Sequence, residues 1–352
     1  MIDRGGLPFS STIRARAPLR LGLAGGGTDL SPYSEDFGGA VLNCTIDRYA
    51  YAFLAPRDDG MLVFEAKDLR KREVFEGPAG VSRSLLDLHR GVYQRMIRDY
   101  NDGRPIPLTV TTTVDAPMGS GLGASSALVV ALVDAFRTLL DAPLGPYEVA
   151  NLAVDIERSD LKLAGGKQDQ YAAAFGGMNY IEFLTNSRVV VNPLRVPNWV
   201  RSELETSLVI AFSGQSRSSA DIISRQTAEM VAKSTEALEA LHQLKADAGE
   251  MKRLLLTGQI LQMAELLNHS WLAKKRTATG VSNSFIDELY MLACSHGALG
   301  GKVSGAGGGG FMMLVCKPED RLELIEVLGQ AGAAAGPVKL TETGCETWRS
   351  RT

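Results

Sequence analysis

The stretch Pro117 to Ala127 holds three alternating glycines followed by two serines, a combination suited to binding phosphate. Glycines allow backbone N–H groups to turn toward an anion. Ser125 and Ser126 stand where an apolar run begins a helix, whose first N–H groups have no partner within the helix. A tight turn with a helix N-cap explains the same residues equally well. The stretch lacks the Lys of a Gly-x-x-x-x-Gly-Lys-Ser/Thr loop, and it does not fit the dinucleotide fingerprint.

A second candidate site follows an N-terminal strand-like segment, where Gly25, Gly26 and Gly27 precede Thr28 and Asp29. Adjacent glycines let the backbone approach a small ligand, and the Asp29 carboxylate can accept hydrogen bonds from hydroxyl groups. The alternative is a flexible turn in which Asp29 caps a helix. The local pattern alone favours that alternative.

Two acids lie twelve positions apart in the middle of the chain. Glu157 falls at the C-terminal end of a predicted helix, where an acid opposes the helix dipole, although pairing with Arg158 or Lys162 explains it equally well. Asp169 falls in the first turn of a short predicted helix, a position that favours Asp for dipole reasons alone. Position therefore does not separate catalysis from helix stabilisation for either acid.

Three further segments carry glycines or cations. The glycine-rich segment Gly300 to Phe311 permits close backbone approach to a ligand or to another loop. The polar loop 213–219 contains Arg217 near a helix start, which suits a second anion, although simple capping is the commoner explanation. The charged run 274–276 is typical of solvated surface.

Regular strands and helices must position these candidate residues. Alternation and apolar spacing predict a strand over 108–114, a buried helix over 128–140, an amphipathic helix over 85–100, long helices between 220 and 272, a helix over 319–329 and a closing strand over 338–340. The polar region 186–202 contains two prolines and predicts a boundary between two domains, over 12–195 and 200–352.

The composition is that of a globular protein. The chain has 352 residues, of which 45% are hydrophobic and 22% charged, and its net charge of -3 provides no basic surface for nucleic acid. It has no apolar run long enough to span a membrane and no apolar signal core at the N-terminus, so we expect a cytoplasmic protein with no membrane partner. The four cysteines have no paired spacing, which predicts free thiols.

The three glycine-rich stretches, at about residues 16–29, 115–127 and 300–311, resemble in type and order the three motifs of the GHMP small-molecule kinases. This family includes galactokinases, homoserine kinases and mevalonate kinases. The resemblance implies an α+β fold, with an N-terminal ATP-binding domain, a C-terminal ferredoxin-like domain and the active site between them. It also implies ATP and Mg2+ as cofactors and a small-molecule acceptor.

The resemblance also implies roles for individual residues. The ATP phosphates would lie on the second motif, at Gly119, Ser120, Gly121, Leu122, Gly123, Ala124, Ser125 and Ser126. Because Ala124 stands where family loops often have the first Ser, Mg2+ would be held by Ser125, with Ser126 as a second candidate, and by Glu157. Asp169 matches the catalytic base. Lys167, which replaces an apolar residue of galactokinases, is a candidate to stabilise charge beside it.

The implied acceptor contacts come mainly from the first and third motifs, at Arg20, Gly26, Gly27, Thr28, Asp29 and Gly307. Galactokinases carry a Glu-His pair just before the Thr-Asp that ends the first motif, and its absence here argues against galactose. If the acceptor already carries a phosphate, Arg217 and Lys275 are the hypotheses for the residues that bind it.

Within the family, the chain most resembles the members that phosphorylate the anomeric hydroxyl of D-glycero-D-manno-heptose 7-phosphate for nucleotide-activated heptose synthesis. The resemblance rests on the end of the first motif, the loop 212–219 and the segment 274–275. Two alternatives stay open: another GHMP kinase, for a sugar such as fucose or galactose, and a non-catalytic ATP- and sugar-binding regulator. A homodimer is compatible with the sequence, which does not determine the oligomeric state.

Overall fold

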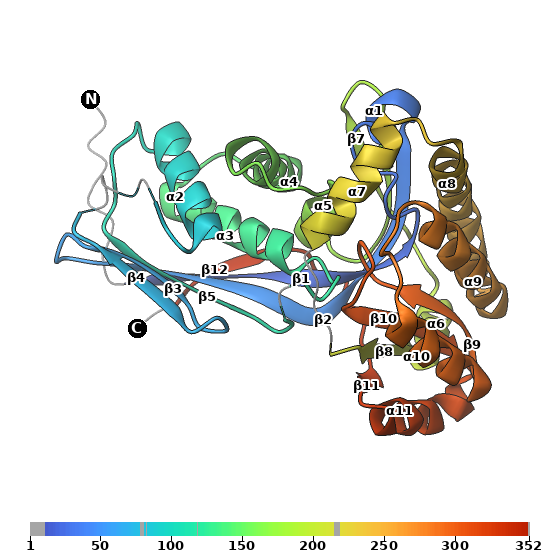
Figure 1. Cartoon of the computed structure of the whole chain (residues 1–352). Helices are drawn as coiled ribbons and strands as arrows, with labels where there is room; N and C mark the ends of the chain where they lie inside the picture. The colour runs from blue at the N-terminus through green and yellow to red at the C-terminus, as the bar shows by residue number, and fades with distance from the viewer. Residues whose placement is uncertain (1–10, 78–80, 82, 118, 215–218, 351–352) are drawn as a thin grey trace.

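The computed structural model describes residues 11–77, 81, 83–117, 119–214 and 219–350, and it is built on two sheets (Figure 1). The larger sheet has eight strands. They are β1 (Thr12–Ala24), β2 (Gly39–Pro56), β3 (Leu62–Ala66), β4 (Lys71–Phe75), β5 (Leu108–Val114), β6 (Met178–Phe183), β7 (Val189–Pro193) and β12 (Glu346–Ser350).

Strand β2 is the centre of this sheet. It pairs antiparallel with β1, β5 and β6, and its length allows the last two to pair with different parts of it. The pairing of β3 with β5 is parallel. Alternate residues of β5 are buried, as the predicted strand over 108–114 requires.

Helices cover one face of the larger sheet (Figure 1). They are α2 (Asp87–Tyr100), α3 (Ala124–Leu140), α4 (Pro146–Asp155) and α5 (Gln168–Phe175), with α1 (Tyr33–Phe37) beyond the end of β1. Helix α3 is apolar on nearly every side and packs against β1, β2, α2, α4 and α5, so it is the centre of the main core. The predicted helices over 85–100 and 128–140 are confirmed.

The smaller sheet has the strand order β11-β8-β10-β9, with every neighbour antiparallel. Its elements are β8 (Leu208–Phe212), β9 (Ala298–Val303), β10 (Phe311–Cys316), β11 (Ala334–Pro337), α10 (Ser284–Ser295), the 3-10 turn Pro318–Asp320 and α11 (Arg321–Gln330). Between β8 and β9 the chain also forms α7 (Ser219–Val231), α8 (Thr235–Leu256) and α9 (Ile260–Arg276), and α6 (Asn198–Ser207) precedes β8. This order is that of a ferredoxin-like sheet, as predicted.

The two parts of the molecule share a core. Met251 of α8 and Leu267 of α9 belong to the same apolar cluster as the buried residues of β1 and β2. Helix α8 packs on both of those strands, and α9 packs on α8 and β9. The C-terminal end of α9 is thereby brought to the glycine turn that follows β1.

The end of the chain differs from the prediction. Residues 338–340 form no regular strand, and only Leu340 makes an isolated bridge, to Ile46. Instead β12 returns to the larger sheet and pairs with β1. The predicted boundary near residues 195–200 stays a prediction. Among the helices described, none is long and apolar enough to cross a membrane.

Candidate active site

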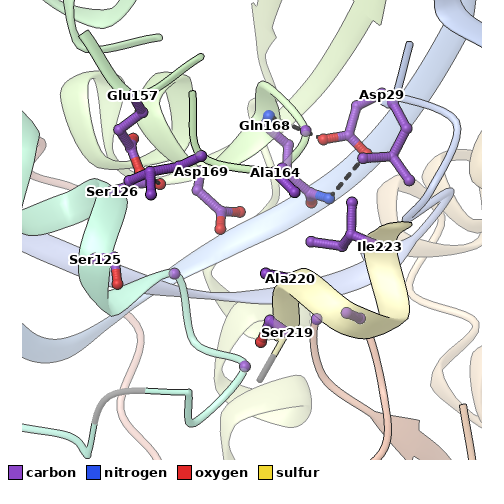
Figure 2. Close-up of a pocket in the computed structure, with 18 of the residues that line it drawn as sticks. Asp29, Ser125, Ser126, Glu157, Ala164, Gln168, Asp169, Ser219, Ala220 and Ile223 are labelled. Carbon is purple, nitrogen blue, oxygen red and sulfur yellow. Dashed lines mark hydrogen bonds between the residues drawn. The ribbon is translucent and has the colours of Figure 1, made fainter. Parts of the chain in front are cut away.

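A cleft of about 470 Å3 lies where the two sheets and their helices meet. Its walls come from the end of β1, the turn after it, the glycine loop, the segment from Glu157 to Asp169, the start of α7, the end of α9 and the turn at Gly305 and Ala306. Figure 2 shows Asp169 between the Ser126–Glu157 pair and Asp29. The three predicted motifs therefore do meet at one cleft.

The glycine loop is supported from behind by the third glycine stretch. Ser304 donates from Oγ to the carbonyl of Gly121 at 2.9 Å, and the Phe311 N–H donates to the carbonyl of Ser120 at 2.9 Å. A Cβ on Gly121 would lie 2.3 Å from the Ser304 carbonyl oxygen, so only glycine fits there. Most of the third stretch thus allows close contact with another loop. The sequence analysis left open whether these glycines approach a ligand or another loop.

Glu157 lies at one end of the cleft in a buried polar cluster. It sits in a π-helical turn, Ile156–Asp160, and only 2% of it is exposed. Ser126 donates from Oγ to Glu157 Oε1 at 3.1 Å, and Gln170 Nε2 donates to Glu157 Oε2 and, at 3.1 Å, to Ser126 Oγ. Burial raises the pKa of the Glu157 carboxyl, and the nearby Arg158 guanidinium opposes that rise.

The serine beside Glu157 is Ser126 rather than Ser125. The sequence analysis names Ser125 as the expected ligand of Mg2+. In Figure 2, Ser125 lies apart from the Ser126–Glu157 pair. The reason is helical geometry, because consecutive residues in the first turn of α3 point about 100° apart. The second candidate of the sequence analysis is the one that the fold brings to the acid.

The donor set at this end suits Mg2+. A carboxylate and a hydroxyl are hard oxygen ligands, and Glu157 is buried where its charge lacks water. Among the described residues no group of three or more His, Cys, Asp or Glu could hold a metal. Mg2+ in kinase sites commonly takes one or two protein carboxylates and fills its remaining positions with water and substrate phosphates.

Asp169 is held by Arg20 of β1. Arg20 donates from Nε at 2.8 Å to Asp169 Oδ1, and its Nη2 lies 2.6 Å from the same oxygen. Its Nη1 donates at 2.5 Å to the Gly121 carbonyl, which ties the pair to the glycine loop. The other carboxylate oxygen, Oδ2, faces Gly123, where a Cβ would lie 3.2 Å away. Arg20, predicted as a substrate contact, thus contacts the predicted base.

Asp29 caps helix α5, which begins more than a hundred residues later. Its Oδ2 accepts the backbone N–H groups of Lys167 at 3.0 Å and Gln168 at 3.1 Å. Its Oδ1 accepts Gly27 N–H and Gln168 Nε2, each at 3.2 Å. A carboxylate at a helix N-terminus is favoured by unpaired N–H groups and by the dipole. Asp29 therefore positions the turn that presents Asp169, and it also lines the cleft.

Other residues of the first motif serve the turn itself. The Thr28 hydroxyl is fully buried and bonds to the backbone of Gly25 and Ala40. Gly27 lines the cleft, whereas Gly26 contributes its carbonyl to a lysine described below. Thr28 was predicted to contact substrate, and the structure instead uses it to close the turn.

The lysine that reaches the cleft is Lys274, not the predicted Lys275. Lys274 is 4% exposed and donates from Nζ to the Gly26 carbonyl at 2.9 Å. Lys275 points away from the cleft toward Asp287, with 3.3 Å between Nζ and Oδ1. Lys167 does not line the cleft either, and its backbone N–H is engaged by Asp29.

Of the loop residues predicted to bind ATP, all but Leu122 line the cleft, and Gly307 of the third stretch does not. Gly307 packs against Val281, since a Cβ there would lie 2.5 Å from the Val281 carbonyl oxygen. Leu122 is fully buried beneath the loop. The hypothesis for Arg217 falls outside the described residues.

Sequence reasoning missed several residues of the cleft. These are Arg158, Gln168, Ser219, Gln226 and Lys274. Arg158 braces the turn before α5 by donating to the carbonyls of Leu163 at 3.2 Å and Gly166 at 2.9 Å. Of these residues, only Lys274 could have been predicted from the local sequence. It lies three residues after Trp271 and therefore on the same buried face of α9.

Comparison with known proteins defines the class. The GHMP kinases N terminal domain matches residues 87–177, and the GHMP kinases C terminal domain matches residues 238–334. The chain belongs to the GHMP kinase family. It is an ATP-dependent sugar kinase by the family's chemistry and by the names of its relatives.

Two relatives align over nearly the whole chain. D-glycero-alpha-D-manno-heptose 7-phosphate kinase of Campylobacter jejuni is 41% identical over 339 residues, covering 96% of this chain and 99% of the relative. The solved D-glycero-D-manno-heptose 1-phosphate kinase from Bacteroides thetaiotaomicron has a TM-score of 0.81 and 40% identity, covering 97% and 100%. Lactococcus lactis galactokinase, with a TM-score of 0.76 and 17% identity over 95% of each chain, shares the fold.

Proposed function

We propose that the protein transfers the γ-phosphoryl group of ATP to the anomeric hydroxyl of D-glycero-D-manno-heptose 7-phosphate, giving the 1,7-bisphosphate and ADP. The observation that carries the proposal is the position of Asp169, in the cleft between the glycine loop and Asp29, with one carboxylate oxygen held by Arg20. The relatives support a heptose phosphate acceptor, although the names of the two relatives differ in the position of its phosphate.

Asp169 acts as the general base in this proposal. Arg20 occupies Oδ1, so Oδ2 accepts the proton of the anomeric hydroxyl. The anomeric oxygen forms a bond to the γ-phosphorus while the bond from that phosphorus to the bridging oxygen of ADP breaks. A positioned base of this kind contributes on the order of 100- to 10,000-fold to the rate, and Arg20 keeps the carboxylate in place through the Gly121 carbonyl.

The glycine loop holds the ATP phosphates. The N–H groups of the loop and of the first turn of α3 have no intrahelical partner and carry the positive end of the helix dipole, so they suit an anion. Glu157 and Ser126 would hold Mg2+ at this end. A bound Mg2+ neutralises charge on the phosphoryl oxygens during transfer.

Asp29 belongs to both the fold and the acceptor site. Four N–H donors already use its carboxylate, and its lone pairs can still accept a sugar hydroxyl where it borders the cleft. A sugar carrying a 1-phosphate is the form that a nucleotidyltransferase activates. We therefore infer a role before such a step in nucleotide-activated heptose synthesis, in the cytoplasm where ATP is made.

ADP release with Mg-ATP over an acceptor panel tests the proposal. The panel contains heptose 7-phosphate, sedoheptulose 7-phosphate, mannose, galactose, fucose and mevalonate. We expect turnover of heptose 7-phosphate with a kcat/KM well above that for every other acceptor. Preferential turnover of an unphosphorylated sugar would keep the kinase and contradict the acceptor, and absence of turnover on every acceptor would contradict catalysis.

A further inference from the structure

We propose that Lys274 anchors the phosphate that the acceptor sugar already carries. This inference rests on the proposed function, because it concerns the far end of the same acceptor. Lys274 comes from the last turn of α9, a helix of the C-terminal part of the chain, and it borders the cleft.

Lys274 Nζ lies at the turn formed by Gly26 and Gly27. It donates to the Gly26 carbonyl at 2.9 Å, and a Cβ on Gly27 would lie 2.8 Å from it. Glycine at position 27 therefore leaves room for the ammonium group beside the cleft. Since α9 is fixed by packing on α8 and β9, the position of this group does not depend on a surface loop.

The charge of Lys274 is incompletely balanced. An ammonium group has three N–H donors, and among the described residues only the Gly26 carbonyl accepts from it. The nearby Asp29 carboxylate already accepts four N–H groups. A second buried lysine, Lys302, donates from Nζ to the Gly22 carbonyl and lies close enough to repel the Lys274 ammonium group. A buried cation is costly unless it is paired, so an anionic ligand is the missing partner.

Burial affects the ammonium group in the expected direction. Burial lowers the pKa of Lys274 to about 8, and Asp29 opposes that change. A phosphate dianion beside Nζ would raise the pKa again and hold the lysine in its charged form. Phosphate binding and protonation of Lys274 therefore favour one another.

The order of groups along the cleft separates the two phosphates. In Figure 2, Asp169 lies between the Ser126–Glu157 pair and Asp29. Lys274 is bonded to Gly26, in the turn that precedes Asp29. A sugar whose anomeric hydroxyl meets Asp169 has the γ-phosphoryl group on the Ser126 side. The other end of the sugar, where the 7-phosphate is attached, then extends toward Lys274.

Gln168 fits the sugar between these two points. The residue is 8% exposed, and its side chain donates from Nε2 to Asp29 at 3.2 Å, while Oε1 is buried and has no hydrogen-bond partner among the described residues. Because this oxygen has almost no exposed surface, the part of Gln168 that a sugar can contact is the rest of its side chain where the residue borders the cleft. Gln168 lines the cleft next to Asp169, in the path that the sugar would take to Lys274.

The test compares phosphorylated and unphosphorylated heptose. For each variant, kcat/KM is measured with heptose 7-phosphate and with the same heptose lacking the phosphate. Loss of a charge-assisted phosphate contact costs about 10- to 100-fold. We expect Lys274→Met to lower the ratio of the two kcat/KM values by that factor, because only the phosphorylated sugar makes the contact that the variant lacks.

The matched variants are Lys275→Met, which neutralises the adjacent lysine, and Arg276→Met, which neutralises an exposed cation on the same turn. Both should leave the ratio unchanged. Lys274→Gln is a second neutral variant and decides the outcome if Lys274→Met loses activity on both sugars.

An unchanged ratio in a Lys274 variant, a reduced ratio in Lys275→Met alone, or loss of both activities in both Lys274 variants would overturn the inference while leaving the proposed function standing. Failure of the wild-type protein to turn over heptose 7-phosphate would instead overturn the proposed function, and the inference with it.

Discussion

At one end of the cleft the backbone of the glycine loop and the Ser126–Glu157 pair border the space, whereas at the other end the side chains of Asp29, Gln168 and Lys274 border it. The first end offers N–H groups and hard oxygens, which suit phosphate and Mg2+. These groups do little to distinguish one sugar from another. The second end offers a carboxylate, an amide and an ammonium group at separate points, which can recognise hydroxyls and an anion.

Under the proposed function, this difference separates the residues that bind the nucleotide from those that select the acceptor. Galactokinase of Lactococcus lactis shares the fold at 17% identity and is named for another sugar. In the proposed reaction, binding of ATP and Mg2+ requires a glycine loop and one acid, whereas binding of the acceptor requires individual side chains. Changes at the first end should therefore affect ATP and Mg2+, and changes at the second end should affect the acceptor.

The largest effect is expected where the two ends meet. Asp169→Asn keeps the shape of the side chain and removes the base, so kcat should fall by about 100- to 10,000-fold. The KM values for ATP and for heptose 7-phosphate should stay near those of the wild type. Steady-state ADP release measures all three. Asp68→Asn, which changes an exposed acid, is the control, and a kcat for Asp169→Asn close to that of the control would argue against the base.

A methyl group on the donor side of Asp169 should also lower the rate. Gly123 has a φ of 76°, and a Cβ there would lie 3.2 Å from Asp169 Oδ2. Gly123→Ala should therefore displace the carboxylate and lower kcat by roughly 100-fold, since small misplacements are costly in catalysis. The left-handed backbone should add about 1–2 kcal/mol of destabilisation.

Gly60→Ala separates these two effects. Gly60 has nearly the same φ, 75°, but a Cβ there meets nothing within 4 Å. Urea unfolding should show a similar loss of stability in both variants, and only Gly123→Ala should lose activity. Equal activity in the two would mean that the space beside Asp169 is not needed.

At the donor end, Glu157→Gln should weaken Mg2+ without affecting the acceptor. The variant retains hydrogen-bonding capacity beside Ser126 and removes the charge, so the Mg2+ concentration for half-maximal rate should rise by about 10- to 100-fold. Because burial raises the pKa of Glu157, the wild-type protein should also need more Mg2+ as the pH falls toward that pKa, and the variant should not. A Mg2+ titration at several pH values measures both effects, with Glu203→Gln as an exposed control.

At the acceptor end, the preference for the phosphorylated sugar should depend on pH. Lys274 is charged below its pKa of about 8 and neutral above it. Asp29 is the charged group that acts on it, and burial lowers the pKa of the neighbouring Lys302 to about 7, so Lys302 is already largely neutral at pH 8. The ratio of kcat/KM for heptose 7-phosphate to that for heptose should therefore fall above pH 8, by at most about tenfold per pH unit. Lys274→Met should show no such fall. A wild-type ratio that is flat from pH 7 to 9.5 would contradict this assignment.

The local pattern predicted the donor end well. A strand, three glycines, two serines and an apolar helix form a unit that is contiguous in sequence, and its structure follows the prediction. The supporting role of the third glycine stretch was left open because pattern alone does not say which backbone another backbone will meet. The structure answers this with the contacts between Gly121 and Ser304.

The acceptor end was predicted less well because it is assembled from distant segments. Asp29 was expected to bind sugar or cap a nearby helix, and it caps one that begins at Gln168. The sequence hypothesis names Lys275, whereas the buried face of α9 passes through Trp271 and Lys274. Strand β12 gave no distinct signal, because its pairing with β1 is decided by tertiary contact.

The most direct test of the proposed reaction is phosphorus NMR of the product formed from ATP and heptose 7-phosphate by the wild-type protein. Besides the signals of ADP, we predict one new sugar phosphate signal that is coupled to the anomeric proton of the heptose and grows in equal amount with ADP. The signal of the 7-phosphate should be retained. A new phosphate on any other hydroxyl, or consumption of ATP without a phosphorylated heptose, would contradict the placement of the anomeric hydroxyl at Asp169.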